Sequence, residues 1–408
     1  MRNKIYVLSA GPGDPEELTP AVKEALMRSC AAAAAPRHRH LAGGHPNIID
    51  MKDFKETFAA LRSELDNGDV SVLVSGDAGI YSLLPLIKKN FQQEEIVVLP
   101  GISSFQSLCA KACETWQDAV ILSGHGRGIS DEKILDAVEH NRSVIFFCDA
   151  DKNPAWLCSL LAEAGLGAVE AVTGERLGAS GERVRRARAE ELAKESFDPL
   201  SIVLLINEEH TARPALLPQD EDFIRTEGVP MTHEEVRAAI IAKLRLTRDD
   251  VLWDIGAGTG SVSIAAAQIC AAVHAVEVNA AAADLVRRNA EKFRLHNIKV
   301  YEMSAMDALD RLPAPDAVFI GGSGKELPAI LERVASAGAG IRVAVSSVSI
   351  KTASICSSVL CGDGFTAFDA AQISVSRVKK AGNAQIWQAR NPVTLFSALT
   401  GAEKEEGK

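Results

Sequence analysis

The stretch VLWDIGAGTGSVSIAAA, residues 251–267, joins an apolar run, a glycine-rich turn and a run of small residues long enough for a helix. This order is typical of the opening strand, turn and helix of a nucleotide-binding α/β domain, with the turn at the carboxyl edge of a parallel sheet. Because the stretch begins only after 250 residues, a further domain must precede it.

The totals describe a folded chain of more than one domain. It has 408 residues, 47% of them hydrophobic and 24% charged, and a formal net charge of −10. The negative charge argues against a nucleic-acid-coating protein, and no apolar run reaches the ~20 residues of a membrane helix. The eight cysteines form no CxxC pair, so we expect them to be core residues and not metal ligands. We therefore expect a cytoplasmic enzyme that binds neither nucleic acid nor a membrane.

Short apolar runs, each followed by a turn and a stretch of helical character, recur along the whole chain. This alternation predicts an α/β protein with mainly parallel sheets. In the first half we expect strands at 5–9, 70–75, 96–99, 119–123, 143–148 and 200–206. In the second half we expect strands at 251–255, 273–278, 298–302, 317–320 and 342–346, and a closing antiparallel pair made of 365–374 and 385–389. The second half is thus predicted to be a doubly wound, Rossmann-like domain.

The polar stretch EEHTARPALLPQDEDFIRTEGVP, which ends at Pro230, separates the two halves. Its three prolines and many charges are typical of a linker or strap. We predict a first domain at residues 1–208, a linker at 209–230 and a second domain at 231–408.

The turn after residue 255 carries Gly256, Gly258 and Gly260, a GxGxG pattern and not the dinucleotide pattern GxGxxG. Glycines there let the backbone approach a ligand closely. Asp254 can accept a hydrogen bond from a ligand ammonium, and Glu277 stands where the next strand ends, which suits two ribose hydroxyls. The pattern favours S-adenosylmethionine (SAM). A ligand-free turn and a nicotinamide site remain open.

The second half then shows a specific resemblance. MTHEEVR at residues 231–237, the glycine turn and PDAVFIGGSG at 315–324 resemble the decarboxylating methyltransferase half of the precorrin-6Y C5,15-methyltransferases of cobalamin biosynthesis. The resemblance covers about residues 228–400 and implies a class I methyltransferase. It implies a SAM pocket lined by Thr232, Asp254, Gly256, Ala257, Gly258, Thr259, Gly260, Glu277, Ser304 and Ala305, with Gly322 on the substrate side. The family usually has Gly-Asp-Ala where this chain has Met303, Ser304 and Ala305.

The first half resembles a second family. GPGD at residues 11–14, SGDAGI at 75–80, LPGISS at 99–104 and SGHGR at 123–127 are similar to motifs of the tetrapyrrole (corrin/porphyrin) methylases. The resemblance covers about residues 4–208 and implies two α/β lobes with SAM between them. The implied SAM contacts are Gly76, Asp77, Ile80, Pro100, Gly101, Ser103 and Ser104. Gly11, Pro12, Gly13 and Asp14 would face the substrate, and Arg127 could pair with a substrate carboxylate.

Together the resemblances imply a bifunctional, SAM-dependent C-methyltransferase and decarboxylase with two SAM sites. It would methylate precorrin-6Y, or its cobalt form, at C5 and C15 and decarboxylate the C12 acetate side chain. A nicotinamide-dependent oxidoreductase and a non-catalytic tetrapyrrole carrier are the alternatives. We expect a homo-oligomer formed through the C-terminal domain. His38, His40 and His45 are interpreted as a solvated basic loop and not as a metal site.

Overall fold

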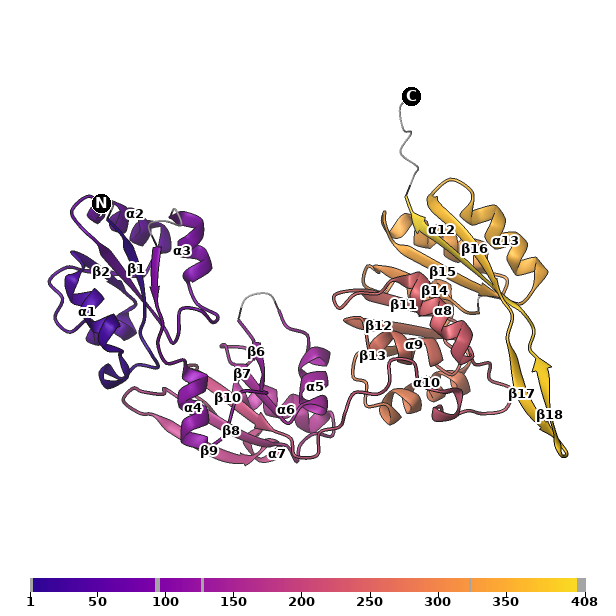
Figure 1. Ribbon diagram of the computed structural model, residues 1–408, viewed down its shortest axis with the longest axis horizontal. Coiled ribbons are helices and arrows are strands. Elements are labelled where there is room, and N and C mark those ends of the chain that lie inside the picture. The colour runs from indigo at the N-terminus through magenta and orange to yellow at the C-terminus, as the bar shows by residue number, and fades with distance from the viewer. Residues whose placement is uncertain (1–2, 92–95, 126–127, 323, 402–408) are drawn as a thin grey trace, which may run out of the picture. The chain divides into compact units, whose positions relative to one another are not determined.

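The computed structural model describes residues 3–91, 96–125, 128–322 and 324–401. The chain divides into two compact units between Thr211 and Ala212, inside the stretch that we expected to link the domains. Figure 1 traces both units in chain order. Among the described residues, no helix combines the length and the apolar character needed to cross a membrane.

Unit 1 begins with a five-stranded sheet in the order β3-β2-β4-β1-β5, in which every pairing is parallel. Its strands are β1 (Ile5–Ser9), β2 (Ala31–Ala34), β3 (Ile48–Asp50), β4 (Val70–Val74) and β5 (Ile96–Leu99). Its helices are η1 (Pro15–Glu17), α1 (Pro20–Arg28), η2 (Pro36–Ala42), α2 (Phe54–Glu64) and α3 (Leu84–Asn90). Residues 31–34 are all alanine and fully buried, so helices can pack closely on both faces of this strand. Separate apolar clusters cover the two faces of the sheet.

The second sheet of unit 1 has the order β6-β7-β10-β8-β9. Its strands are β6 (Val120–Ser123), β7 (Ser143–Phe147), β8 (Glu170–Glu175), β9 (Arg183–Arg188) and β10 (Ser201–Ile206). The prediction of a mainly parallel arrangement is wrong here, because β10 lies antiparallel between β7 and β8, and β8 pairs antiparallel with β9. Its helices are α4 (Ser104–Ala112), α5 (Asp131–His140), α6 (Pro154–Glu163) and α7 (Ala189–Leu192).

Strand β9 is an edge strand that carries four arginines. All four form ion pairs with glutamates of neighbouring segments: Arg183 with Glu175, Arg185 with Glu175 and Glu195, Arg186 with Glu114 and Glu170, and Arg188 with Glu190. The row of positive charge is thus matched by carboxylates along the same edge.

Unit 2 is built on one seven-stranded sheet in the order β13-β12-β11-β14-β15-β19-β16. The first five of these strands run parallel, as predicted for a doubly wound domain. They are β11 (Val251–Ile255), β12 (Ala272–Glu277), β13 (Ile298–Glu302), β14 (Ala317–Ile320) and β15 (Arg342–Ser347). The helices are η4 (Asp220–Asp222), α8 (Glu234–Leu244), α9 (Ser261–Ala267), α10 (Ala280–Lys292), α11 (Ala305–Leu309), α12 (Leu327–Ala337) and α13 (Ile350–Leu360). Large apolar clusters bury both faces.

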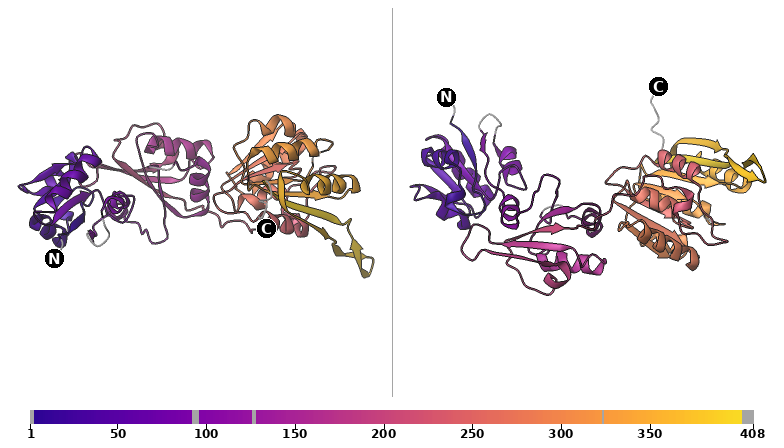
Figure 2. Two further views of the ribbon diagram at one scale, coloured as in Figure 1. Left: turned by 90° about the horizontal axis from the view of Figure 1, so that it is seen from above. Right: turned by 60° about the horizontal axis from the view of Figure 1, so that its bottom comes forward.

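The C-terminal strands pair differently from our expectation. β16 (Phe365–Ile373) pairs with β19 (Val393–Thr400), which lies in the sheet beside β15. Residues 385–389 belong instead to β18 (Ala384–Ala389), which forms a separate ribbon with β17 (Ser376–Ala381). This ribbon projects from the sheet of unit 2 (Figures 1 and 2). The predicted pair was wrong because the apolar residues of β18 are exposed, so their alternation does not mark a core strand.

The turns after β11 and β14 touch each other through their backbones. Gly256 has φ +74°, and a Cβ built on it would lie 2.2 Å from the carbonyl oxygen of Gly322. The Gly321 amide also donates to the Ile255 carbonyl at 2.9 Å. Only glycine permits both this φ and this approach.

Gly256→Ala should therefore destabilise unit 2 by about 3 kcal/mol or more, since it adds a clash to the strain of a left-handed residue. Gly340→Ala is the matched control, because Gly340 has φ +83° but a Cβ added to it would meet nothing within 4 Å. The control should cost about 1 kcal/mol. Urea unfolding of the full chain measures both. Equal losses for the two variants would contradict the close-approach argument.

Candidate functional site

A cavity of roughly 1200 Å³ opens at the carboxyl edge of the unit 2 sheet. It is bounded by the segments that follow β11, β12, β13, β14 and β15, and by residues 228–233 before α8. Of the residues predicted from the sequence, those that line it are Thr232, Gly256, Ala257, Gly258, Glu277, Ser304, Ala305 and Gly322. The carboxyl edge of the sheet thus brings together side chains that lie up to 90 positions apart in the chain.

Asp254, Thr259 and Gly260 are not among the lining residues. Gly260 precedes α9, and its Cβ would meet Val286 of α10 at 3.0 Å. Thr259 is only 1% exposed. In this structure the three residues support the turn without lining the cavity, and their contact with a cofactor stays a prediction.

The glycines of the turn also act differently from our expectation. A Cβ on Gly258, which has φ +57°, would lie 2.7 Å from the carbonyl oxygen of Pro230. Pro230 accepts a hydrogen bond from the Thr259 amide at 3.3 Å. At Gly256 and Gly258 the missing side chains therefore make room for other backbone, which fixes the turn before any ligand is considered.

The Glu277 carboxylate holds the ends of two turns together. Its Oε2 accepts from the Gly258 amide and its Oε1 from the Asn279 amide, both at 2.9 Å. Each carboxylate oxygen keeps a further lone pair, and the side chain lines the cavity. Glu277 can therefore also accept hydrogen bonds from hydroxyls of a ligand.

Ser304 is the N-cap of α11. Its hydroxyl accepts from the Asp307 amide at 3.2 Å and donates to the Asp307 carboxylate at 2.7 Å. The hydroxyl that replaces the usual family carboxylate is thus engaged in local capping.

In unit 1 the predicted residues gather where β1, β4 and β5 end. The Gly11 and Gly76 backbones form an isolated antiparallel bridge. The Asp77 carboxylate accepts from the Gly101 amide at 2.9 Å, the Gly79 amide at 2.7 Å and the Ser9 hydroxyl at 3.4 Å. Asp77 therefore ties three turns to one another, a role that the sequence did not indicate.

The remaining predicted residues of unit 1 lie close by. Ser103 caps α4 in a capping box with Gln106, and Ser104 begins that helix. Ile80 packs against the apolar cluster beneath the second sheet. Gly13 packs against Gly178, and its carbonyl is 2.9 Å from His40 Nε2. Pro12 and Asp14 share this turn, Pro100 precedes Gly101, and Arg127 lies outside the described residues.

Comparison with known proteins matches each unit to a family. Residues 4–193 match the tetrapyrrole (corrin/porphyrin) methylases and residues 222–400 the precorrin methyltransferase domain. A probable cobalt-precorrin-6B C(15)-methyltransferase (decarboxylating) of Pyrobaculum calidifontis is 41% identical over 186 residues, which are 44% of this chain and 93% of that protein. The chain belongs to the precorrin methyltransferases.

Two further relatives extend the comparison. The precorrin-6Y C(5,15)-methyltransferase [decarboxylating] of Sinorhizobium sp. is 28% identical over 340 residues, 81% of this chain and 80% of that protein. The solved precorrin-6Y C5,15-methyltransferase of Geobacter metallireducens GS-15 is 33% identical and covers 44% of this chain and 94% of its own, with a TM-score of 0.40. The two family matches and the Pyrobaculum and Sinorhizobium relatives confirm the predicted family, fold class and enzyme class: this precorrin methyltransferase is an enzyme that methylates and decarboxylates.

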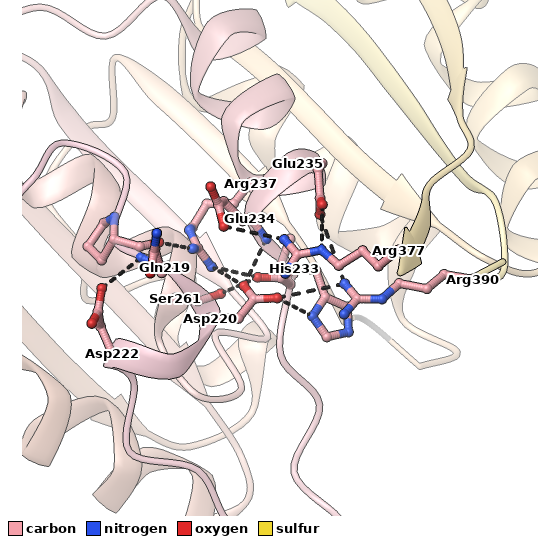
Figure 3. A network of polar contacts seen from close by, with 12 residues as sticks. Gln219, Asp220, Asp222, His233, Glu234, Glu235, Arg237, Ser261, Arg377 and Arg390 are labelled. Carbon is pink, nitrogen blue, oxygen red and sulfur yellow. Dashed lines mark hydrogen bonds and ion pairs between the residues drawn. The ribbon is translucent and has the colours of Figure 1, made fainter. Parts of the chain in front are cut away.

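A polar network lies beside the unit 2 cavity, and the sequence did not predict it (Figure 3). At its centre is Asp220, which is 2% exposed. It accepts from His233 Nδ1 at 2.6 Å and from the Glu234 amide at 2.9 Å, and lies 3.5 Å from Arg237 Nη1. Burial by itself raises the pKa of Asp220, but these hydrogen bonds and the Arg237 charge outweigh burial, so the pKa is lowered.

Arg237 is the arginine of the MTHEEVR motif and is fully buried. It donates to the carbonyls of Thr232 and Pro218 and lies over the Phe223 ring, 4.7 Å from its centroid. Phe223 is in turn buried in the unit 2 core. Residues 218–223, which we had placed in a linker, therefore pack on unit 2. Only the family motif could have indicated this network, through its arginine.

The expectation of a solvated loop at residues 38–45 is wrong for two of the three histidines, while His40 is exposed. His38 and His45 are 4% and 5% exposed. Burial lowers the pKa of His38 to about 4, and His45 is within 3.0 Å of the carbonyls of Asn47 and Ser29. Basic neighbours in the sequence suggested a surface, but η2 places the His38 ring in the interior, and His45, which follows η2, is buried as well. Among the described residues, no group of three or more possible ligands is arranged to hold a metal ion.

Asp254 lies in the interior of unit 2. It is fully buried and accepts a hydrogen bond from the Ser263 hydroxyl. Burial raises its pKa to about 6, the Ser263 hydrogen bonds oppose the rise and the Glu277 charge adds to it. Asp254 does not line the cavity, and its direct contact with a ligand ammonium stays a prediction.

The raised pKa gives a pH-dependent stability. Above about pH 6, the pKa of Asp254 in the folded protein, the folded state holds a buried negative charge that costs stability. As the pH falls from 6 toward the ordinary pKa of 3.8, Asp254 is protonated in the folded protein but still ionised in the unfolded chain, so this cost disappears. Asp254→Asn should therefore stabilise unit 2 at about pH 7 by on the order of 2 kcal/mol, and this gain should shrink toward pH 4. Urea unfolding of variant and wild type across this range measures the difference. The exposed Asp249→Asn is the control; a gain independent of pH would contradict the burial argument.

Proposed function

We propose that this enzyme methylates precorrin-6Y, or its cobalt form, at C5 and C15 and decarboxylates the C12 acetate side chain, in cobalamin biosynthesis. Unit 1 carries out the C5 methylation, and unit 2 carries out the C15 methylation and the decarboxylation. Each unit binds its own SAM, which supplies a methyl group on a sulfonium. The relatives named for both positions and for decarboxylation support this assignment.

The observation that carries the proposal is the unit 2 cavity. Its roughly 1200 Å³ exceed the ~300–1,000 Å³ of ordinary small-ligand sites, so that SAM and part of a macrocycle have room together. Glu277 offers acceptors to the ribose hydroxyls, and the Ser304–Ala305 step borders the adenine region. The cavity-lining turn contributes backbone and no strong base. Its role is to hold methyl donor and carbon nucleophile in line and to exclude water.

The unit 1 site rests on the match over residues 4–193 and on the turns tied by Asp77. With its carboxylate bound to Gly79, Gly101 and Ser9, Asp77 holds the turns together, and Gly76, Ile80 and the 100–104 turn contact SAM. Gly11, Pro12, Gly13 and Asp14 face the tetrapyrrole. The expectation of a homo-oligomer formed through unit 2 stays a prediction.

Incubation of the full chain with precorrin-6Y and methyl-labelled SAM tests the proposal. Mass spectrometry should show two labelled methyl groups in the product and the loss of one CO2. Calorimetric titration should give two SAM sites per chain. A product without label, or a single site in the intact chain, would contradict the bifunctional assignment.

Two variants divide the chemistry between the units. Gly258→Arg adds a side chain whose Cβ would meet the Pro230 carbonyl oxygen at 2.7 Å and so displaces the turn that lines the unit 2 cavity; it should abolish C15 methylation and CO2 loss together and leave the C5 methyl. Asp77→Arg should give the mirror result, because it breaks the ties between the unit 1 turns. Gly340→Arg is the control, because Gly340 also has a positive φ of +83° but a Cβ added there would meet nothing within 4 Å. Release of CO2 by Gly258→Arg would show that the decarboxylase is not in unit 2.

A further inference from the structure

Within the Asp220 network, the two side chains that line the cavity are His233 and Arg390. Asp220, Glu234, Glu235, Arg237 and Arg377 are not lining residues. In the view of Figure 3 the His233 ring and the Arg390 guanidinium lie on the same side of Asp220, and Arg237 lies on the other. The network therefore turns basic groups toward the cavity and keeps its carboxylates behind them. Such a surface suits a ligand that carries carboxylates.

Asp220 and His233 form a dyad of fixed orientation. Asp220 Oδ2 is 2.6 Å from His233 Nδ1, and Oδ1 is held by the Glu234 amide and Arg237. Because the lowered pKa keeps Asp220 ionised, Nδ1 carries the proton in this pair. Nε2 lies on the opposite side of the ring, and the side chain is 41% exposed. This is the arrangement in which a carboxylate fixes the orientation of an imidazole.

Arg390 supplies a second basic group beside the dyad. Its Nη1 lies 3.7 Å from Asp220 Oδ2 and 3.9 Å from Glu235 Oε2. These distances allow charge attraction but no hydrogen bond, and Nη1 is buried without a hydrogen-bond partner among the described residues. By contrast, Arg377 donates to Glu235 at 2.7 Å and to Glu234 at 3.3 Å. The Arg390 side chain as a whole is 32% exposed and lines the cavity, where its positive charge can attract a carboxylate of a ligand.

The decarboxylation needs a proton donor. When a carboxymethyl group becomes a methyl group, the bond between the CH2 carbon and the carboxylate breaks and CO2 leaves. The electron pair passes into the conjugated macrocycle as a carbon–carbon double bond to that CH2. The pair then returns to the CH2 carbon, which takes up one proton. Binding and orientation alone cannot supply this proton, and a positioned general acid typically accelerates such a step about 10²–10⁴-fold.

We propose that His233 is the general acid that delivers this proton from Nε2, and that Arg390 anchors a neighbouring carboxylate of the substrate. The proposal rests on the assignment of the decarboxylation to unit 2. After the transfer His233 is neutral, with its remaining proton on Nδ1 and donated in a hydrogen bond to Asp220, and Nε2 regains a proton from solvent. Arg390 binds a carboxylate other than the one that leaves, since an ion pair to that group would stabilise it against loss of CO2.

Two substitutions of His233 separate acid catalysis from structure. His233→Asn keeps an amide nitrogen near the Nδ1 position for Asp220, and His233→Gln keeps one near Nε2, but neither amide is an acid. His274→Asn is the control, because His274 lies in the same unit, is hydrogen-bonded to the Tyr301 hydroxyl at 3.0 Å and does not line the cavity. Each full-length variant is assayed for SAM binding, for methyl transfer and for CO2 release from precorrin-6Y.

Both His233 variants should bind SAM like the wild type and release CO2 about a hundredfold more slowly or worse. Methyl transfer should fall less, and His274→Asn should behave as the wild type. Added imidazole should restore CO2 release to His233→Gly, which a merely structural role would not allow. Unchanged CO2 release in the Asn and Gln variants, or a loss that imidazole does not restore, would overturn the proposal. Failure of the wild type to methylate or decarboxylate would instead refute the proposed function.

Discussion

The geometry of the unit 2 site depends on contacts between backbones. The turn after β11 lies against the turn after β14 at Gly256 and Gly322, and against the lead-in to α8 at Gly258 and Pro230. These contacts leave no space for a Cβ, so the floor of the cavity is set by main-chain packing and not by side chains that could change rotamer. Packing of this kind is stiff. Methyl transfer needs such stiffness, because a displacement of the reacting groups by a fraction of an ångström is costly.

Carboxylates that accept from backbone amides shape both units. Asp77 joins the turns after β1, β4 and β5, and Glu277 joins the turns after β11 and β12. In each unit a loop that would otherwise be mobile is held by charge-assisted hydrogen bonds. The two unrelated sheets thus share one feature: an acidic side chain at the carboxyl edge holds neighbouring turns together by accepting hydrogen bonds. Contact with a ligand is a second task, for which only its remaining lone pairs are available.

The sequence predicted those parts of the fold that follow from local patterns. The parallel strands of unit 2 and the residues around the glycine turn were found because apolar runs and turns repeat in step with the structure. Residues whose role depends on distant partners could not be predicted. Asp254 was expected to face a ligand, yet it is buried against Ser263. Asp220 was placed in a linker, because its partners His233 and Arg237 follow only after a polar stretch. Strand β18 shows the opposite error. Its alternating apolar residues predicted a strand of the main sheet, but all of them are exposed and the strand belongs to the separate ribbon.

The arginine-rich edge strand β9 affects the tendency of this protein to aggregate at high concentration. An unpaired strand edge is a template on which another chain can add a strand. At this edge, an incoming strand would have to separate Arg183 and Arg186 from Glu175, Glu170 and Glu114 and strip water from the separated charges, which is costly. The ion pairs therefore act as a barrier to aggregation through the second sheet of unit 1, in addition to compensating the buried carboxylate of Glu175.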